Sequence, residues 1–450
     1  MIAKARKCAY LALLRIESED TNLPTALETE RHTLNDERDQ KLLLDIVTGT
    51  VRWERLIDYF VECFSQRELS KIDIEIKIIL RLSIYQLLYL DRVPASAVVN
   101  DAVKLTRTIR KKSADAFVNG VLRTLIRQRH DLPKPSRPTE KTPHADAANY
   151  LGITYSHPDW LVKRWIERFG FKSTEEWVKF NNEIPSVMLR VNRLKGTPLT
   201  IARKLSAEGI ETKPSHYSPD GLKVIAGNPV KRISDGLFFI QDEASQLIAP
   251  LLGIKNGDIV LDLCAAPGGK TTQLASVVGS KGLVVASDVR QNRLRLLKKT
   301  VSLSGSDRIR IVEISSSGSL PYRITFDRVL VDVPCSGLGT IRRDPDIRWK
   351  RQPEELTLLG KKQGILLDRA ATVVKSKGRL VYATCSTEPE ENEDVIDSFL
   401  DRQPDFQLLD LRTLPVPKTL NSLIDDRGMF RTRPFLDHLD GFFAAALSRV

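Results

Sequence analysis

Two stretches of the chain each end an apolar run with a cysteine. FDRVLVDVPCSG carries Asp332 and Cys335, and RLVYATCSTEPEEN carries Cys385. An ionised cysteine is a strong nucleophile, and a nearby carboxyl group can act as acid, base or hydrogen-bond partner. These residue types suit chemistry by a nucleophilic thiol. We interpret the acids after Cys385 as the solvated first turn of a helix that begins near Pro389 and not as catalytic groups.

A third stretch, DIVLDLCAAPGGKTTQLA, predicts a buried strand over 259–263, a turn of small residues and a helix from about Lys270. Small residues let the backbone approach a ligand, and the start of a helix offers free N–H groups. The next strand ends at Asp288, about twenty residues after the glycines, where a carboxylate can accept hydrogen bonds from ribose hydroxyls. This pattern predicts a nucleotide-type cofactor site, and it fits either NAD or S-adenosylmethionine.

From about residue 241, short apolar runs alternate with segments long enough for helices. This rhythm is typical of βαβ units and a largely parallel sheet, which predicts a C-terminal α/β domain over 241–450. Ligands of such sheets bind beyond the carboxyl ends of the strands. Cys264, Asp332, Cys335 and Cys385 all follow strands, so we expect them to converge on one edge of the sheet.

The first part of the chain has a helical pattern. Apolar residues recur at three and four positions through residues 1–130, which predicts an all-α domain in which Cys8 and Cys63 are core thiols. Residues 131–148 contain a proline-rich stretch and are expected to be a linker. Residues 149–240 mix helical and strand-like runs and suggest a small α+β module.

The basic charge of the chain favours a polyanionic partner. The 450 residues carry a net charge of +12, and eight basic residues against Asp115 alone lie between Lys104 and Arg129, as phosphate binding requires. Further cations suited to phosphates follow Cys335: Arg342, Arg343, Arg348, Lys350 and Arg351.

We expect neither a membrane span nor a signal peptide, and the N-terminus is interpreted as an amphipathic helix. The five cysteines are scattered without a Cys-x-x-Cys pair, so we expect no disulfide framework and no metal site. A cytoplasmic protein is the expectation, and nothing in the sequence demands more than a monomer.

Four motifs together resemble the RNA cytosine-C5 methyltransferases that use S-adenosylmethionine: CAAPGGK (264–270), DVPCSG (332–337), YATCS (382–386) and DHLDGFFAAAL (437–447). The stretches VPASAVVNDAVKL and FVNGVLRTLIR resemble a NusB-like RNA-binding domain. Their combination resembles the bacterial 16S ribosomal RNA cytosine-C5 methyltransferases of the Fmu/Sun family over essentially the whole chain. The implied architecture is a NusB-like helical domain, a small α+β RNA-binding module and a Rossmann-like methyltransferase domain.

The resemblance also implies residue roles. S-adenosylmethionine would be held by Asp288, Asp332 and the turn residues Cys264, Ala265, Ala266, Pro267, Gly268, Gly269 and Lys270. Cys385 would attack the cytosine, Cys335 would assist product release, and Asp332 would act near the ring nitrogen N3. An unstacked base in 16S ribosomal RNA is the implied substrate.

Two positions depart from the family pattern. The usual acid after the third strand is missing, so Glu313 or Ser315 must replace it, and Val333 stands where the family has alanine. We expect activity to survive the second change, because it adds volume without removing a functional group.

Without the resemblance, the residues do not decide whether Cys335 or Cys385 attacks.

Two other functions are alternatives to a methyltransferase. A non-catalytic RNA-binding factor of ribosome assembly or antitermination, with a retained cofactor fold, is the alternative function. An NAD-dependent oxidoreductase would need Gly-x-Gly-x-x-Gly after the first strand, where the chain has CAAPGG.

Overall fold

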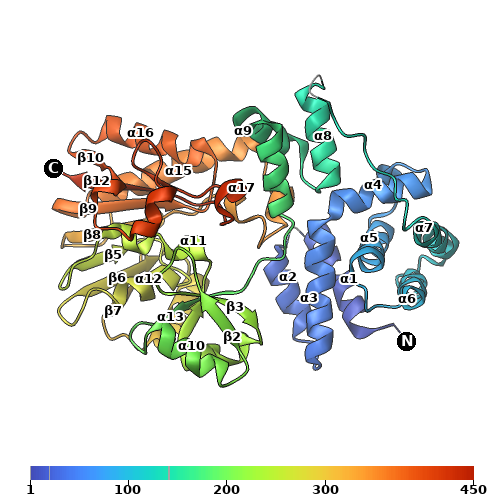
Figure 1. Cartoon of the computed structure of the whole chain (residues 1–450), viewed down its shortest axis with the longest axis horizontal. Coiled ribbons are helices and arrows are strands. Elements are labelled where there is room, and N and C mark those ends of the chain that lie inside the picture. The colour runs from blue at the N-terminus through green and yellow to red at the C-terminus, as the bar shows by residue number, and fades with distance from the viewer. Residues whose placement is uncertain (1, 20, 140–141) are drawn as a thin grey trace. The chain divides into compact units, whose positions relative to one another are not determined.

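A computed structural model describes residues 2–19, 21–139 and 142–450. The chain forms two compact units, the first made of residues 1–183 with 341–350 and the second of residues 184–340 with 351–450 (Figure 1). The predicted domain ranges 1–130, 131–148, 149–240 and 241–450 divide the chain at other points. They remain a prediction about folding domains.

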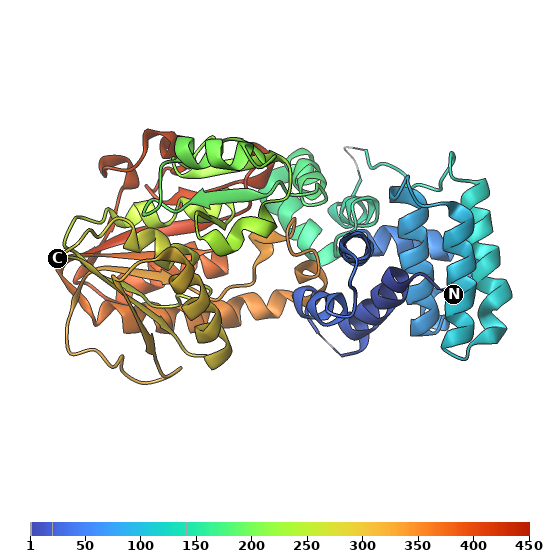
Figure 2. The same cartoon turned by 90° about the horizontal axis from the view of Figure 1, so that it is seen from below.

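The first unit is helical, as the periodicity predicts. Its helices are α1 (Lys4–Ser18), α2 (Leu23–Arg31), α3 (Glu37–Arg52), α4 (Glu54–Ser65), α5 (Ile74–Tyr89), α6 (Ala95–Thr108), α7 (Asp115–Arg127), α8 (His144–Thr154), α9 (Asp159–Phe180) and α14 (Ile347–Lys350). Helices α1–α7 gather into one bundle (Figure 2). In the part of the chain that the structure describes, no helix is both long and apolar enough to cross a bilayer.

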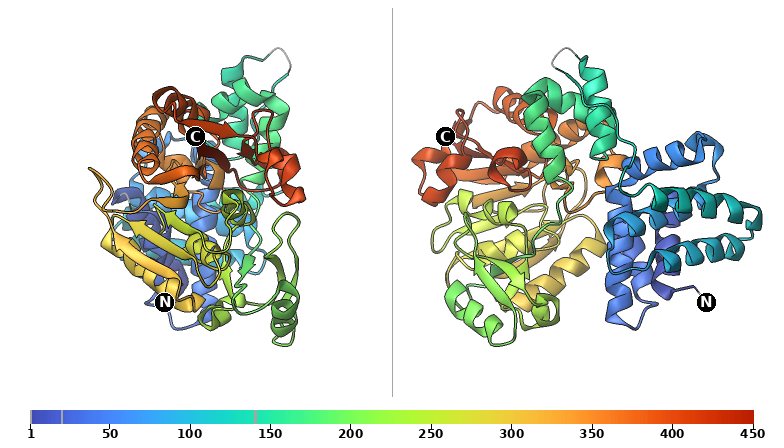
Figure 3. Two further views of the ribbon diagram at one scale, coloured as in Figure 1. Left: turned by 90° about the vertical axis from the view of Figure 1, so that its left-hand side faces the viewer. Right: turned by 45° about the vertical axis from the view of Figure 1, so that its right-hand side comes forward.

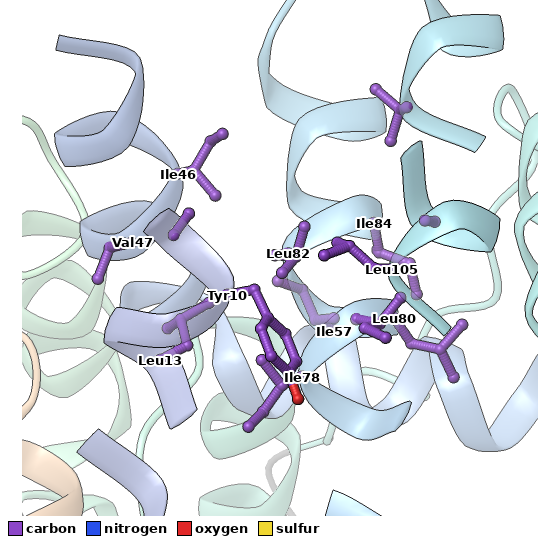
Figure 4. Packing of buried hydrophobic residues seen from close by; sticks show 14 of the residues in the cluster. Tyr10, Leu13, Ile46, Val47, Ile57, Ile78, Leu80, Leu82, Ile84 and Leu105 are labelled. Atoms are coloured by element: carbon purple, nitrogen blue, oxygen red, sulfur yellow. The ribbon is translucent and has the colours of Figure 1, made fainter. Parts of the chain in front are cut away.

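The bundle is held by side chains at helical spacing. On α4, for example, Ile57, Phe60 and Val61 are buried, which places positions i, i+3 and i+4 on one face. They join a core whose labelled members interdigitate in Figure 4. Cys8 belongs to this core as expected, but Cys63 is exposed, so its expected core position is wrong. It lies two residues beyond Val61, about 200° around the helix from the apolar face.

A ten-residue segment of the C-terminal part of the chain, residues 341–350, belongs to the helical unit. The guanidinium of Arg348 is fully buried there and donates to the carbonyl of Ser156 at 2.7 Å and to Asn182 Oδ1 at 3.0 Å. The expectation that Arg348 serves phosphates is therefore wrong, because its side chain is buried and holds acceptors inside the protein.

The second unit contains a four-stranded antiparallel sheet in the order β2-β3-β1-β4, with helix α10 packed against it (Figure 3). Its elements are β1 (Met188–Val191), α10 (Pro198–Ser206), β2 (Glu211–Pro214), β3 (Gly221–Ala226) and β4 (Phe238–Ile240). Buried and exposed residues do not alternate along β1, because all four of its residues are buried.

The larger sheet of the same unit has the order β10-β12-β9-β8-β5-β6-β7, and β11 (Phe430–Arg431) pairs with β12. Its other strands are β5 (Ile259–Asp262), β6 (Leu283–Asp288), β7 (Ile309–Glu313), β8 (Phe326–Asp332), β9 (Val374–Thr384), β10 (Phe406–Leu409) and β12 (Phe443–Arg449). Strands β5 to β9 are parallel, as predicted, whereas β12 is antiparallel to both β9 and β10. The Rossmann-like α/β prediction is confirmed.

Both faces of this sheet are covered, so the central residues of its inner strands are apolar. The helices that follow β4 in the second unit are α11 (Glu243–Gln246), α12 (Gly269–Ala275), α13 (Gln291–Ser304), α15 (Pro353–Ala371), α16 (Glu393–Arg402) and α17 (Pro434–Asp437). Val260 of β5 packs in the core with α12 and α13, and the next residue, Leu261, packs in the core with α15 and α16. The alternation fixes the face on which each side chain packs, and the parallel direction of β5, β6, β8 and β9 brings the motifs after them to one edge of the sheet.

Candidate active site

Cys335 and Cys385 lie side by side at the carboxyl ends of β8 and β9. Their sulfur atoms are 3.0 Å apart, and the backbone N–H of Cys385 donates to Cys335 Sγ at 3.3 Å. Both thiols are free and half-buried. The expected convergence of the two cysteines on one sheet edge is what the structure shows.

The two thiols differ in their surroundings. The hydrogen bond with Cys385 and burial raise the pKa of Cys335 well above its usual value, and the Glu391 carboxylate adds to the rise. Cys335 therefore keeps its proton at neutral pH. A protonated Cys335 can donate to Cys385 Sγ across the 3.0 Å contact.

Asp332, the third expected member of this group, ends β8 and pairs with Lys270. Lys270 Nζ lies 2.7 Å from Asp332 Oδ2, and the same ammonium lies 5.6 Å from the ring centroid of Phe442. The Asp332 carboxylate raises the pKa of Lys270 despite its burial. Lys270 was expected to hold the cofactor, and the structure joins its amine to the carboxylate beside the thiols.

The turn over 264–270 lies between β5 and α12. The Ala266–Pro267 peptide bond is cis, and Gly268 has φ 107°, a left-handed conformation that favours glycine. Asp288 Oδ2 accepts from the Ala266 N–H at 3.2 Å and pairs with Arg293 Nε at the same distance. The Asp288 carboxylate, at the end of β6, thus holds the backbone of the turn through a hydrogen bond.

Three aspartates lie around this turn. Burial raises the pKa of Cys264, and the carboxylates of Asp262, Asp332 and Asp288 raise it further. The Asp288 carboxylate at the end of β6, beside a turn of small residues, fits a ligand that bears ribose hydroxyls, and S-adenosylmethionine is such a ligand. The residues at this position therefore fit that cofactor.

The two candidates for the missing third-strand acid differ in position. Glu313 ends β7 directly opposite Asp288 in the strand register, and its carboxylate accepts from Gln291. Ser315 lies beyond the strand and is exposed, and its hydroxyl accepts from the Ser317 N–H. Glu313 is the better placed of the two to act beside Asp288.

The acids after Cys385 are not all solvated. Glu388 and Glu391 are fully buried, so the interpretation of these acids as a solvated helix turn is wrong for these two residues. Residues Pro389–Glu391 form a short 3-10 helix before α16. The Glu391 carboxylate accepts from the hydroxyls of both Ser336 and Ser386, each at 2.5 Å, and therefore joins the two cysteine loops.

Glycines let the two cysteine loops meet. The Gly339 N–H donates to the Cys385 carbonyl at 3.0 Å, and the Gly441 N–H donates to the Gly339 carbonyl at 2.7 Å. A Cβ on Gly339 would lie 1.9 Å from the Gly441 carbonyl oxygen. The close approach excludes any side chain at Gly339.

Several residues of the site were missed by sequence reasoning. Gln363 and Tyr382 contact Glu391, and Arg190 of β1 donates to the Gly269 carbonyl at 2.9 Å. One signal was present for the contacts of Glu391 with Ser336 and Ser386, because serine follows the cysteine in both motifs. Arg190 gave no local signal, since its partners lie 51 to 82 residues away in the sequence.

No group of three or more His, Cys, Asp or Glu side chains within residues 2–19, 21–139 and 142–450 is arranged to hold a metal ion.

Family models match three parts of the chain. The model for 16S rRNA methyltransferase RsmB/F matches residues 249–448, that for the NusB family matches residues 3–127, and that for the ferredoxin-like domain of RsmF/B-like methyltransferases matches residues 157–231. The expected NusB-like helical domain and the small α+β module both correspond to these matches.

Curated relatives match over nearly the full length. The chain is 35% identical to the probable ribosomal RNA small subunit methyltransferase B of Synechocystis sp., with 99% of each chain covered. It is 32% identical to the probable ribosomal RNA small subunit methyltransferase B of Bacillus subtilis, covering 99% of this chain and 98% of that one. The ribosomal RNA small subunit methyltransferase B of Escherichia coli O127:H6 is 31% identical, with 98% of each covered.

Two solved structures show the same fold. The crystal structure of PH0851 has a TM-score of 0.80 and 26% identity, covering 100% of this chain and 99% of that one. NSun6 from Pyrococcus horikoshii, solved with SFG, has a TM-score of 0.58 and 21% identity, covering 65% of this chain and 98% of that one.

Proposed function

Because the chain belongs to the 16S rRNA methyltransferase RsmB/F family, we propose that it forms 5-methylcytosine in 16S ribosomal RNA by covalent catalysis. It is an S-adenosylmethionine-dependent ribosomal RNA methyltransferase. The proposal adds the base, the atom that is methylated and the residues that act. Membership in a methyltransferase family also weighs against the alternative of a non-catalytic assembly or antitermination factor.

The chemistry requires a nucleophile other than the base itself. Cytosine C5 is too weak a nucleophile to take a methyl group directly, and addition of a thiolate at C6 turns the ring into an enamine that can. S-adenosylmethionine, held by the 264–270 turn, Asp288 and the Asp332 region, supplies the methyl group. A base must then take the proton from C5, and the C6–sulfur bond breaks as the C5–C6 double bond re-forms. This step releases 5-methylcytosine and returns Cys385 as a thiolate.

Cys385 is the proposed nucleophile, and Cys335 assists release of the product. The support is the 3.0 Å contact between the sulfur atoms, together with the raised pKa that keeps Cys335 protonated. That contact is the one observation that carries the mechanism, since two adjacent thiols can divide attack and release between them.

Asp332 is proposed to act on the cytosine at N3, where charge develops during attack. Its pairing with the Lys270 ammonium, 2.7 Å away, places a positive charge beside the carboxylate, which can then stay ionised and accept a hydrogen bond from the base. Lys270 thus has a role on the substrate side in this proposal. Asp288 and Glu313 remain for the ribose and the adenine side of the cofactor.

The target base must leave its stack to reach the thiols, so we propose an unpaired or transiently opened cytosine. The net charge of +12 favours binding of the RNA backbone. All five cysteines are free thiols, which fits the proposed cytoplasmic, reducing location, and we propose that the protein acts as a monomer.

The test uses a 16S ribosomal RNA transcript and labelled S-adenosylmethionine. Cys385→Ala should abolish both methyl transfer and the covalent protein–RNA adduct on a denaturing gel. Cys335→Ala should accumulate that adduct. An adduct that persists in Cys385→Ala and disappears in Cys335→Ala would reverse the assignment. Mapping 5-methylcytosine in ribosomal RNA from a deletion strain identifies the target position.

A further inference from the structure

A single buried carboxylate connects the two cysteine loops. Glu391 is 0% exposed and accepts hydrogen bonds from four donors on three different segments. The donors are the Ser336 N–H at 2.8 Å, the Ser336 hydroxyl at 2.5 Å, the Ser386 hydroxyl at 2.5 Å and Gln363 Nε2 at 2.9 Å.

The arrangement is symmetric about the thiol pair. Ser336 directly follows Cys335, and Ser386 directly follows Cys385. Their hydroxyls both donate to Glu391 Oε2 and lie 3.2 Å from each other. One oxygen atom therefore fixes the separation of two loops that are fifty residues apart in the sequence.

A second layer holds the carboxylate itself. Gln363 Nε2 donates to the Pro334 carbonyl as well as to Glu391, and the Tyr382 hydroxyl donates to the backbone carbonyl of Glu391 at 2.5 Å. A buried carboxylate is stable only when donors replace its water, and these contacts supply them. Glu391 is thus part of a rigid network in which every partner is also buried.

We propose that Glu391 is a positioning residue that sets the distance and orientation between Cys385 and Cys335. The inference depends on the proposed division of attack and release between these thiols. Both carboxylate oxygens already accept hydrogen bonds, so Glu391 acts through the two serines and not by direct contact with the substrate.

Glu391→Gln tests the clamp with little change in volume. The glutamine amide has one acceptor oxygen where the carboxylate has two. Its NH2 group must therefore face a group that donates a hydrogen bond to the carboxylate in the wild-type protein. We expect kcat to fall about ten- to hundredfold, in line with the loss of hydrogen bonds to a charged group. KM for RNA and the affinity for S-adenosylmethionine should stay within about twofold. Glu354→Gln, an exposed acid on α15, is the matched control and should behave as wild type.

The two serines separate the steps. Ser386→Ala should slow formation of the covalent adduct, measured in the Cys335→Ala background where the adduct accumulates. Ser336→Ala in the otherwise wild-type protein should slow release, so that adduct becomes visible during turnover. Adding Glu391→Gln to the double serine variant should cause little further loss, because all three changes break the same connection.

The outcomes are distinct. Wild-type kcat in Glu391→Gln, or wild-type adduct formation and release in both serine variants, would overturn the clamp. If Glu391→Gln melts early or loses cofactor binding, the serine variants decide the question. Absence of any adduct in Cys335→Ala with the other residues intact would instead contradict the proposed covalent mechanism, independently of Glu391.

Discussion

The Asp332 carboxylate is tied to the cofactor turn, because its partner Lys270 is the last residue of that turn, and it precedes Cys335 by three residues. Asp332→Asn keeps the size of the side chain and removes its charge. We expect kcat to fall by about 10² to 10⁴, the usual range for a lost acid–base group. Affinity for S-adenosylmethionine should change by only a few-fold. Single-turnover methylation and calorimetric titration measure the two quantities, and a large loss of affinity at unchanged kcat would assign Asp332 to cofactor binding alone.

The neighbouring carboxyl group of Asp262 predicts a pH effect on stability. Its Oδ2 accepts from the Thr271 hydroxyl at 2.6 Å, and its Oδ1 is buried without a hydrogen-bond partner among the described residues. Burial raises the pKa of Asp262 to about 7. An unfolded aspartate ionises near pH 4, so between about pH 4 and pH 7 the folded state binds more protons than the unfolded state. The Asp262 contribution to the free energy of unfolding is therefore present at low pH and lost as the pH rises through about 7.

Asp262→Asn should remove this slope. Relative to wild type, the free energy of unfolding of the variant should rise by up to about 4 kcal/mol between pH 4 and pH 8. Urea unfolding of both proteins at the two pH values measures the difference. Parallel pH profiles would show that Asp262 ionises in the folded protein as it does in the unfolded one.

Strand β1 reaches the cofactor turn through one side chain. Arg190 is 1% exposed, and it donates to the Gly269 carbonyl, to Thr272 Oγ1 at 2.6 Å and to Gln241 Oε1 at 2.6 Å. Burial lowers the pKa of Arg190 to about 10, so it stays charged at neutral pH. The antiparallel sheet therefore supports the first turn of α12 from outside the Rossmann-like layer.

Arg190→Met should weaken binding of S-adenosylmethionine about tenfold or more, because the turn loses charge-assisted hydrogen bonds that hold its backbone. Calorimetric titration measures the affinity. Arg193→Met is the control, since Arg193 is more exposed and pairs with Asp220 at the surface of the same sheet. Equal losses in both variants would mean that the small sheet acts through its overall stability.

The elements that carry the site could be predicted because their signals are local. Cys335 and Cys385 follow apolar runs, and the carboxyl ends of parallel strands share one edge, so strand assignment alone brings the thiols together. Glu391 could not be predicted in the same way, because an acid in the stretch EPEEN is ordinarily solvated. Its donors come from loops and a helix distant in the sequence. The burial of Arg348 could not be predicted for the same reason, since its acceptors lie on the segments that follow α8 and α9.

The segment 341–350 belongs to the helical unit, although the residues before and after it in the sequence belong to the second unit. The chain passes between its two compact units after residues 183, 340 and 350, so three covalent crossings connect them. The second crossing follows Cys335 by only five residues. Trp349 Nε1 donates to the Val51 carbonyl at 3.0 Å, and the Leu23 N–H donates to Asp346 Oδ2 at 2.9 Å, so the first helices of the unit hold this segment in addition to the contacts of Arg348.

Arg348→Ala should therefore destabilise the helical unit while sparing cofactor binding. The change leaves the carbonyls of Ser156 and Asn181 without their charged donor, a loss of about 3 kcal/mol or more. Hydrogen exchange should accelerate in α8, α9 and the segment 341–350, and calorimetry should show an earlier transition. Lys362→Ala, an exposed cation on α15, should leave both measurements unchanged. Unaltered exchange in Arg348→Ala would mean that Trp349 and Asp346 alone anchor the segment, and uniform acceleration in both units would mean that they unfold as one.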